Sequence, residues 1–128
     1  MILGNKNKIL SITFATIWIS VSEFFRNEFL CKSIWLDHFS SLGLIFPSKP
    51  INGILWGFWS LGLAISIFLI SQRLKFLHTF FFIWFVGFVL MWIVTWNLGI
   101  LPIAILAYAI PLSLFELYLA TWIIYKFK

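Results

Sequence analysis

Long apolar runs separated by short polar segments dominate the hydrophobic pattern of this chain. These runs cover residues 9–25, 51–72 and 76–125. A membrane-spanning helix needs about 20 mostly apolar residues, so the first two runs predict one span each. The third run is long enough for two, and the segment 97–102 (Asn-Leu-Gly-Ile-Leu-Pro) is the turn signal within it. The pattern predicts four spans, at about 9–25, 51–72, 76–96 and 100–125.

These spans are predicted to be helices rather than strands. The alternation of apolar and polar residues that marks a strand is absent from the runs. In lipid, only helices and closed barrels satisfy every backbone polar group. The expected fold class is therefore all-α integral membrane, with residues 1–128 forming a single domain that is a compact bundle of four transmembrane helices.

The segment between the first two spans, residues 26–50, has a different pattern. Its apolar residues recur near helical spacing, with charged and hydroxyl residues between them. The apolar set is Phe29, Leu30, Ile34, Trp35, Phe39 and Leu42. This pattern is typical of a short amphipathic helix that lies in a membrane interface. We expect a short interfacial helix here, on the extracytoplasmic side.

Composition supports a membrane protein and excludes several other classes. Hydrophobic residues make up 62% of the chain and charged residues 10%, whereas soluble domains average roughly 45–50% and about 25%. The nine Lys and Arg residues are scattered, so no basic run could follow a phosphate backbone, and we expect no nucleic-acid partner. With one cysteine, two histidines and no nucleotide-binding, zinc or serine-hydrolase motif, we expect no cofactor and no metal.

The distribution of positive charge predicts how the chain is oriented. With four spans, six of the nine Lys and Arg residues fall on one side of the bilayer, namely Lys6, Lys8, Arg73, Lys75, Lys126 and Lys128. Lys and Arg are enriched in cytoplasmic segments. We therefore expect a multi-pass protein of the cytoplasmic (inner) membrane with both termini in the cytoplasm.

Small and polar residues form stripes at helical spacing and predict which helix faces point inward. The stripes are Thr13, Thr16, Ser20, Glu23 and Asn27 in the first span, Gly53, Gly57, Ser60 and Ala64 in the second, and Ala109, Ser113, Glu116 and Ala120 in the fourth. Such stripes are also how membrane helices pack without any further function, and that interpretation stays open.

Glu116 is the only charged residue between Lys75 and Lys126, and it falls well inside the fourth span. A charged group at the centre of a bilayer costs roughly 2.5–3.5 kcal/mol on insertion scales, so such residues are candidate functional sites. Counting from the ends of the spans places its expected partners at similar depth. These are Thr16, Ser20 and Ser66, together with Ser113 on its own helix face. Glu116 is either a proton or cation site or a neutral acid that joins helices by hydrogen bonds.

A second polar group is predicted at the outer ends of the spans. Glu23, Arg26 and Asn27 end the first span and Asn97 ends the third, and Glu23 and Arg26 are spaced to pair on one face. Tryptophans gather on the same side, namely Trp35, Trp56, Trp59, Trp92 and Trp96. They predict either an aromatic belt at headgroup level or an aromatic-walled pocket for a cationic or amphipathic ligand. By depth, this group and Glu116 are too far apart to form one site.

The favoured function is binding or transport of a small cationic or amphipathic ligand, with the membrane-embedded carboxylate of Glu116 as the proton or cation site. The expected partners are the lipid bilayer and, because four helices barely enclose a path, further copies of the chain in a homo-oligomer or the other subunits of a larger membrane complex. One alternative is a non-catalytic subunit or assembly factor of a membrane complex. The other, less expected, is a small membrane enzyme acting on a lipid-like substrate at the outer leaflet through Glu23, Asp37 or His38.

Overall fold

The computed structural model describes residues 2–128, with side chains from Asn7 onward, and every regular element in that range is a helix. The side chain of Lys6, one of the six basic residues expected on the cytoplasmic side, lies outside the described residues. Four helical stretches are long and apolar enough to cross a membrane, namely Asn7–Leu30, Pro50–Ser71, Phe76–Asn97 and Ile103–Phe127. The predicted four-span helical bundle is confirmed.

The first span is longer than predicted. Helix α1 (Ile2–Phe25) runs directly into a π-helical turn, η1 (Arg26–Leu30), in which the Cys31 amide donates to the Arg26 carbonyl at 2.8 Å. The predicted end near residue 25 is therefore wrong by more than a helical turn. Because Glu23 and Arg26 neutralise each other on one face, their charges do not end the helix there.

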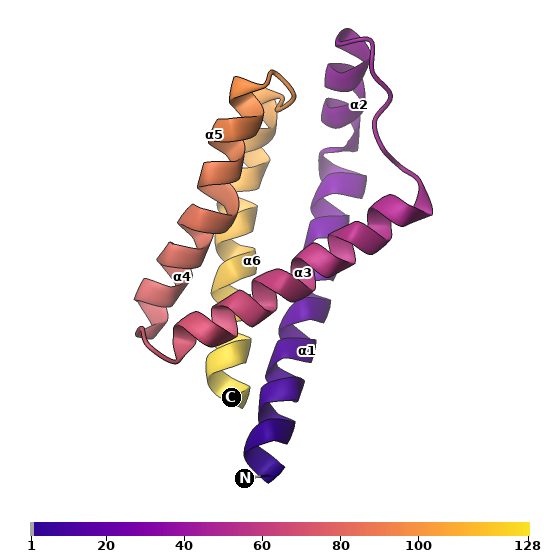
Figure 1. Ribbon diagram of the computed structural model, residues 1–128. Helices are drawn as coiled ribbons and strands as arrows, with labels where there is room; N and C mark the ends of the chain where they lie inside the picture. Colours follow the sequence, from indigo (N-terminus) through magenta and orange to yellow (C-terminus); the bar gives the residue numbers. More distant parts are fainter. Residues whose placement is uncertain (1) are drawn as a thin grey trace.

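A short helix that is not one of the four spans, α2 (Lys32–Ser41), follows the first span as expected. Its direction differs from the expectation, because Figure 1 shows α2 continuing roughly along the line of α1 instead of lying across the bundle end. The His38 ring nitrogen lies 2.9 Å from the carbonyl oxygen of Gly99, so α2 packs against the connection between the last two spans. Gly43, with φ of 72°, ends the helix in the left-handed region that glycine favours.

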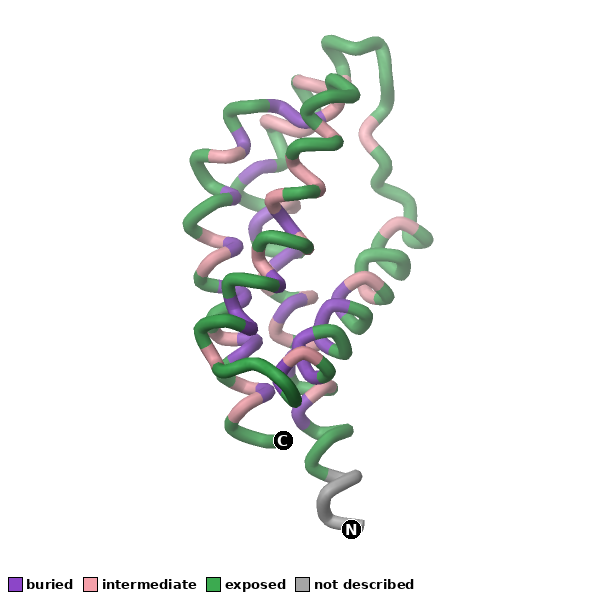
Figure 2. Tube along the Cα trace, turned by 60° about the vertical axis from the view of Figure 1, so that its left-hand side comes forward, coloured by how far each residue is buried: buried purple, intermediate pink, exposed green. Residues whose placement is uncertain are grey.

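Helix α3 (Pro50–Ser71) has a well-defined start. Pro50 occupies the first helical turn, where its missing N–H costs nothing. The Asn52 side chain accepts a hydrogen bond from the Lys49 amide at 2.9 Å. Figure 1 shows α3 crossing α1 at a steep tilt, so its first half extends away from the other spans. Figure 2 shows the same half mostly exposed, whereas buried and exposed residues alternate along the second half.

The third and fourth spans form a hairpin. The third comprises α4 (Phe76–Trp84), a π-helical turn η2 (Phe85–Val89) and α5 (Leu90–Asn97). The chain reverses at Gly99, with φ of 77°, as the turn signal predicted. It then enters a short 3₁₀ turn, η3 (Ile103–Ile105), and α6 (Leu106–Phe127).

Helix α6 is the central element of the bundle. It packs against α1, α3 and α4, and it lies between α1 and the α4–α5 helix in Figure 1. Its buried face contains the predicted stripe of Ala109, Ser113, Glu116 and Ala120. Both described ends of the chain lie at the same end of the bundle, which we call the terminal end.

The predicted stripes on α1 and α3 are only partly correct. The buried face of α1 and η1 consists of Ser11, Ala15, Ile19, Glu23 and Arg26. Thr13 is exposed, and Thr16, Ser20 and Asn27 are half-buried at the edges of that face. On α3, Ser60 and Ala64 are buried, whereas Gly53 is exposed and Gly57 half-buried. The stripe of α3 therefore faces the core only from Ser60 onward.

Candidate functional site

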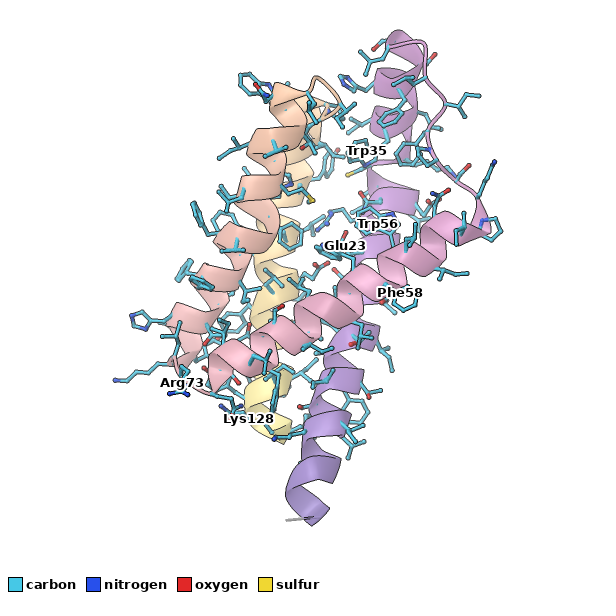
Figure 3. The ribbon with its side chains drawn as sticks, in the orientation of Figure 1. Glu23, Trp35, Trp56, Phe58, Arg73 and Lys128 are labelled. Atoms are coloured by element: carbon cyan, nitrogen blue, oxygen red, sulfur yellow. The ribbon has the colours of Figure 1, made fainter. Side chains whose placement is uncertain are left out.

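Three charged side chains meet inside the bundle, and we call them the charged triad. Arg26 Nη2 donates to Oε1 of Glu23, one helical turn earlier on the same face. The other guanidinium nitrogen, Nη1, lies 3.8 Å from Oε1 of Glu116 on α6. The exposed fractions are 4% for Glu23, 6% for Arg26 and 0% for Glu116. Figure 3 shows Glu23 at mid-height of the bundle. One guanidinium thus faces two buried carboxyl groups.

A second layer of hydrogen bonds fixes the ion pair. Asn27 Nδ2 donates to Oε2 of Glu23 at 3.1 Å and to the Glu23 backbone carbonyl at 3.0 Å. Asn27 Oδ1 in turn accepts a hydrogen bond from Trp35 Nε1 at 3.0 Å. Both carboxylate oxygens of Glu23 are therefore satisfied, and α2 is connected to the triad through Trp35.

The Glu116 carboxyl group has no such support. Among the described residues, neither of its oxygens nor Nη1 of Arg26 has a hydrogen-bond partner. The backbone beside it is fixed, because Trp18 Nε1 donates to the Glu116 carbonyl oxygen at 2.8 Å. An unpaired buried polar group costs about 1–3 kcal/mol, and more when it is charged. Glu116 is thus the least satisfied member of the triad.

The expectation of two separate polar sites is wrong, because Glu23, Arg26 and Glu116 form one. The reason is the offset between the helices. Phe14 of α1 packs on Phe127 of α6, with ring centroids 5.4 Å apart, so the first turns of α1 extend past the end of α6. Counted from this contact at about 1.5 Å per residue, Glu23 and Glu116 lie roughly 14 and 16 Å along their helices. They therefore lie at nearly the same depth.

The hydroxyl partners predicted for Glu116 bond elsewhere. Thr16 Oγ1 donates to the Ile12 carbonyl at 2.7 Å, and Ser66 is exposed and donates to the Gly62 carbonyl at 2.8 Å. Both are local bonds within their own helices, which is a common arrangement for hydroxyl residues in helices. Ser20 is half-buried, and in the described part of the chain its hydroxyl makes no hydrogen bond to the Glu116 carboxyl group.

Ser113 and Asn97 are also not ligands of the triad. Ser113 is buried and accepts a hydrogen bond from Trp84 Nε1 at 2.9 Å, which joins α4 to α6. Asn97 is exposed at the end of α5. The structure therefore brings together Glu116, Glu23, Arg26 and Asn27 from the predicted site residues, and leaves Ser113 and Asn97 outside.

An aromatic wall with rings from α3, η2 and α5 borders the triad. The Arg26 guanidinium lies over the Phe88 ring, 5.5 Å from its centroid. Phe88, which is 1% exposed, contacts Trp59 of α3 at 5.6 Å and Trp92 of α5 at 5.8 Å between centroids. Trp56 continues this series on α3, 5.7 Å from Trp59. Four of the five predicted tryptophans thus lie on α3 and α5, two helices that Phe88 connects, and the fifth, Trp35, lies on α2.

A groove lies beside this wall, between the third span and the start of α6. Its volume is about 240 Å³ and its lining is entirely apolar or aromatic. The lining residues are Val89, Trp92, Ile93 and Trp96 from the third span and Leu101, Ile103 and Leu106 from the following segment. Trp92 and Trp96 therefore border a hollow. Trp56 and Trp59 do not line it.

Sequence reasoning missed two residues that contact the triad. Trp18 and Phe88 are each one of many aromatic residues in apolar runs, and no spacing singles them out. The two π-helical turns of the described chain were also unexpected, and they meet at the triad, because Arg26 begins η1 and Phe88 lies in η2. Single π-helical turns are rare and frequently occur at functional sites.

These features define the class as a multi-pass helical membrane protein with a buried triad of charged residues. No protein-family model, curated protein or solved structure matches the chain.

Proposed function

We propose that this protein binds and transports a small cationic or amphipathic ligand, and that the Glu116 carboxylate is the proton or cation site. The observation that carries the proposal is the state of that carboxyl group. It is fully buried, neither oxygen has a hydrogen-bond partner among the described residues, and the Arg26 guanidinium lies 3.8 Å away. A carboxylate in an apolar interior needs a proton, a hydrogen-bond donor or a cation.

The charge balance of the triad supports a site for one positive charge. Arg26 is already paired with Glu23, whose second oxygen is bonded to Asn27. With both carboxyl groups ionised, the triad carries one net negative charge. The neighbouring helices do not compensate it, because α3 has no charged residue and the third span has only His78, in its first turn. One proton or one monovalent cation on Glu116 makes the triad neutral.

The aromatic wall supports a ligand that is an organic cation. Phe88 already holds a guanidinium over its ring, and Trp59 and Trp92 both contact that ring. Aromatic faces attract desolvated cations by about 2 kcal/mol or more. A ligand that combines positive charge with apolar surface suits both the wall and the carboxylate.

The test is uptake of a fluorescent lipophilic cation into proteoliposomes that carry a pH gradient. The Glu116→Gln variant keeps the side-chain shape but loses the charge, and it should abolish gradient-driven uptake. Glu28→Gln is the matched control. The Glu28 side chain is 34% exposed and, among the described residues, its carboxylate is bonded to Lys32, at 3.1 Å, away from the triad, so uptake by this variant should stay unchanged. Unchanged uptake by a correctly folded Glu116→Gln variant would refute the proposal.

The same proposal includes an orientation and an assembly. The lysines and the arginine at the terminal end, Lys8, Arg73, Lys75, Lys126 and Lys128, are all exposed, and Figure 3 shows Arg73 and Lys128 there. By the preference of basic residues for the cytoplasm, this end faces inward in the cytoplasmic membrane and both termini are cytoplasmic. Four helices barely enclose a path, which favours a homo-oligomer or a larger membrane complex as the transporting form.

A further inference from the structure

The groove between the third span and α6 is suited to an alkyl chain. Every residue that lines it is aliphatic or aromatic, and its volume is about 240 Å³. It opens laterally, because Ile93, Trp96 and Ile103 at its edges are each more than half exposed. The lining lies within or directly beside two candidate spans, at the end of the bundle opposite the termini. A polar ligand would find no partner there, whereas a hydrocarbon chain from the bilayer would.

Trp92 connects this groove to the charged triad. It lines the groove and also packs against both groups of buried residues in the bundle, one around Phe88 and one around Leu101. On its inner side its ring contacts Phe88, which carries the Arg26 guanidinium. Two aromatic rings in series, Trp92 and Phe88, thus lie between the groove and the Arg26 guanidinium. Because Phe88 is only 1% exposed, passage between them requires its ring or that of Trp92 to rotate.

We propose that the ligand of this protein is a single-chain amphiphilic cation, such as a long-chain ammonium compound. Its alkyl chain lies in the groove lined by Trp92, Trp96 and Ile103, and its positive head binds Glu116. This inference rests on the proposed function, since it takes the triad as the cation site. It adds the chemical class of the ligand and a lateral route of entry from the leaflet opposite the terminal end.

The experiment measures binding to the protein in lipid nanodiscs with three probes. Hexadecyltrimethylammonium carries the chain and the charge, tetraethylammonium carries the charge alone, and hexadecyl sulfate carries the chain with the opposite charge. The groove is filled by Ile103→Trp, a change at an exposed edge position that does not disturb the core. Leu69→Trp is the control, because Leu69 is equally exposed on α3 away from the groove.

We expect Ile103→Trp to weaken hexadecyltrimethylammonium binding roughly tenfold, the lower end of the discrimination that a misfitted apolar pocket gives. Tetraethylammonium binding should not change, Leu69→Trp should bind as the natural chain does, and Glu116→Gln should weaken both cations. If Glu116→Gln weakens both but Ile103→Trp has no effect, or if hexadecyl sulfate binds as tightly as the cation, this inference fails and the proposed function survives. If neither cation depends on Glu116, both fail.

Discussion

Removing the guanidinium of Arg26 should destabilise the bundle far more than removing an exposed lysine. Arg26→Met keeps the length and apolar stem of the side chain and leaves the carboxyl groups of Glu23 and Glu116 without a positive partner. The side chains of the Arg26–Glu23 pair are 7% and 4% exposed, whereas those of the Lys32–Glu28 pair are 47% and 34% exposed. Breaking a buried pair costs about 3–5 kcal/mol, and breaking an exposed pair costs about 0–1 kcal/mol.

The assay is reversible unfolding in mixed micelles of a mild detergent and dodecyl sulfate, followed by tryptophan fluorescence. Arg26→Met should lower the free energy of unfolding by about 3 kcal/mol or more, and Lys32→Met by less than about 1 kcal/mol. The double variant Glu23→Gln, Arg26→Met should recover part of the loss, because one unpaired buried carboxylate has been removed. The matching double change at Glu28 and Lys32 should show almost no coupling between the two positions.

The reasoning is refuted if Arg26→Met and Lys32→Met lower the free energy of unfolding equally. Equal effects would mean that the Arg26 guanidinium is hydrated in the folded protein and does not depend on the carboxyl groups around it. The same result would weaken the case for Glu116 as a cation site, since that case assumes a desolvated triad. A loss confined to Arg26→Met, with no recovery in the double variant, would instead assign the stabilisation to its contact with Phe88.

Two further predictions use cysteine chemistry. Cys31, directly after the first candidate span, is fully buried. Burial raises the pKa of its thiol above the ordinary value, and the positive charge of Arg26 partly offsets that rise. A raised pKa means less thiolate at a given pH, so maleimide labelling of the folded protein in detergent should be slow until the protein unfolds. In a Cys31→Ser background, Lys75→Cys should react with a membrane-impermeant maleimide in inside-out vesicles and not in right-side-out ones, and the opposite pattern would refute the proposed orientation.

The spans were predictable because hydrophobic length and turn residues are local signals. Gly99 and Pro102 were enough to predict the reversal at residues 97–102, and Pro50 was enough to predict the start of α3. The depth of Arg26 was not predictable in the same way. A charged residue normally marks the end of a span, but Arg26 is neutralised within the same helix by Glu23, and that pairing has no single-residue signature. The helix therefore continues for another turn.

Partners on different helices were the least predictable feature of the site. Equal distance from the charged ends of two spans was assumed to mean equal depth, which placed Glu116 beside Thr16 and Ser20. That assumption fails when helices are offset along their axes, as the contact of Phe14 with Phe127 requires. The offset results from side-chain packing between helices, so it depends on the whole bundle and not on the pattern within one span.

The two π-helical turns explain why spacing rules failed at the triad in particular. Along the first span the buried positions step by three or four residues up to Arg26, and the next buried position is Cys31, five residues on. Along the third span the step from Ile83 to Phe88 is likewise five. A π-helical turn adds one residue to a helical turn, which keeps a residue at i+5 on the buried face. In a regular α-helix, Gly87 would take the place of Phe88 beneath the Arg26 guanidinium, and the triad would lack its aromatic wall. The π-helical turn η2 therefore places the aromatic wall beside the charged triad.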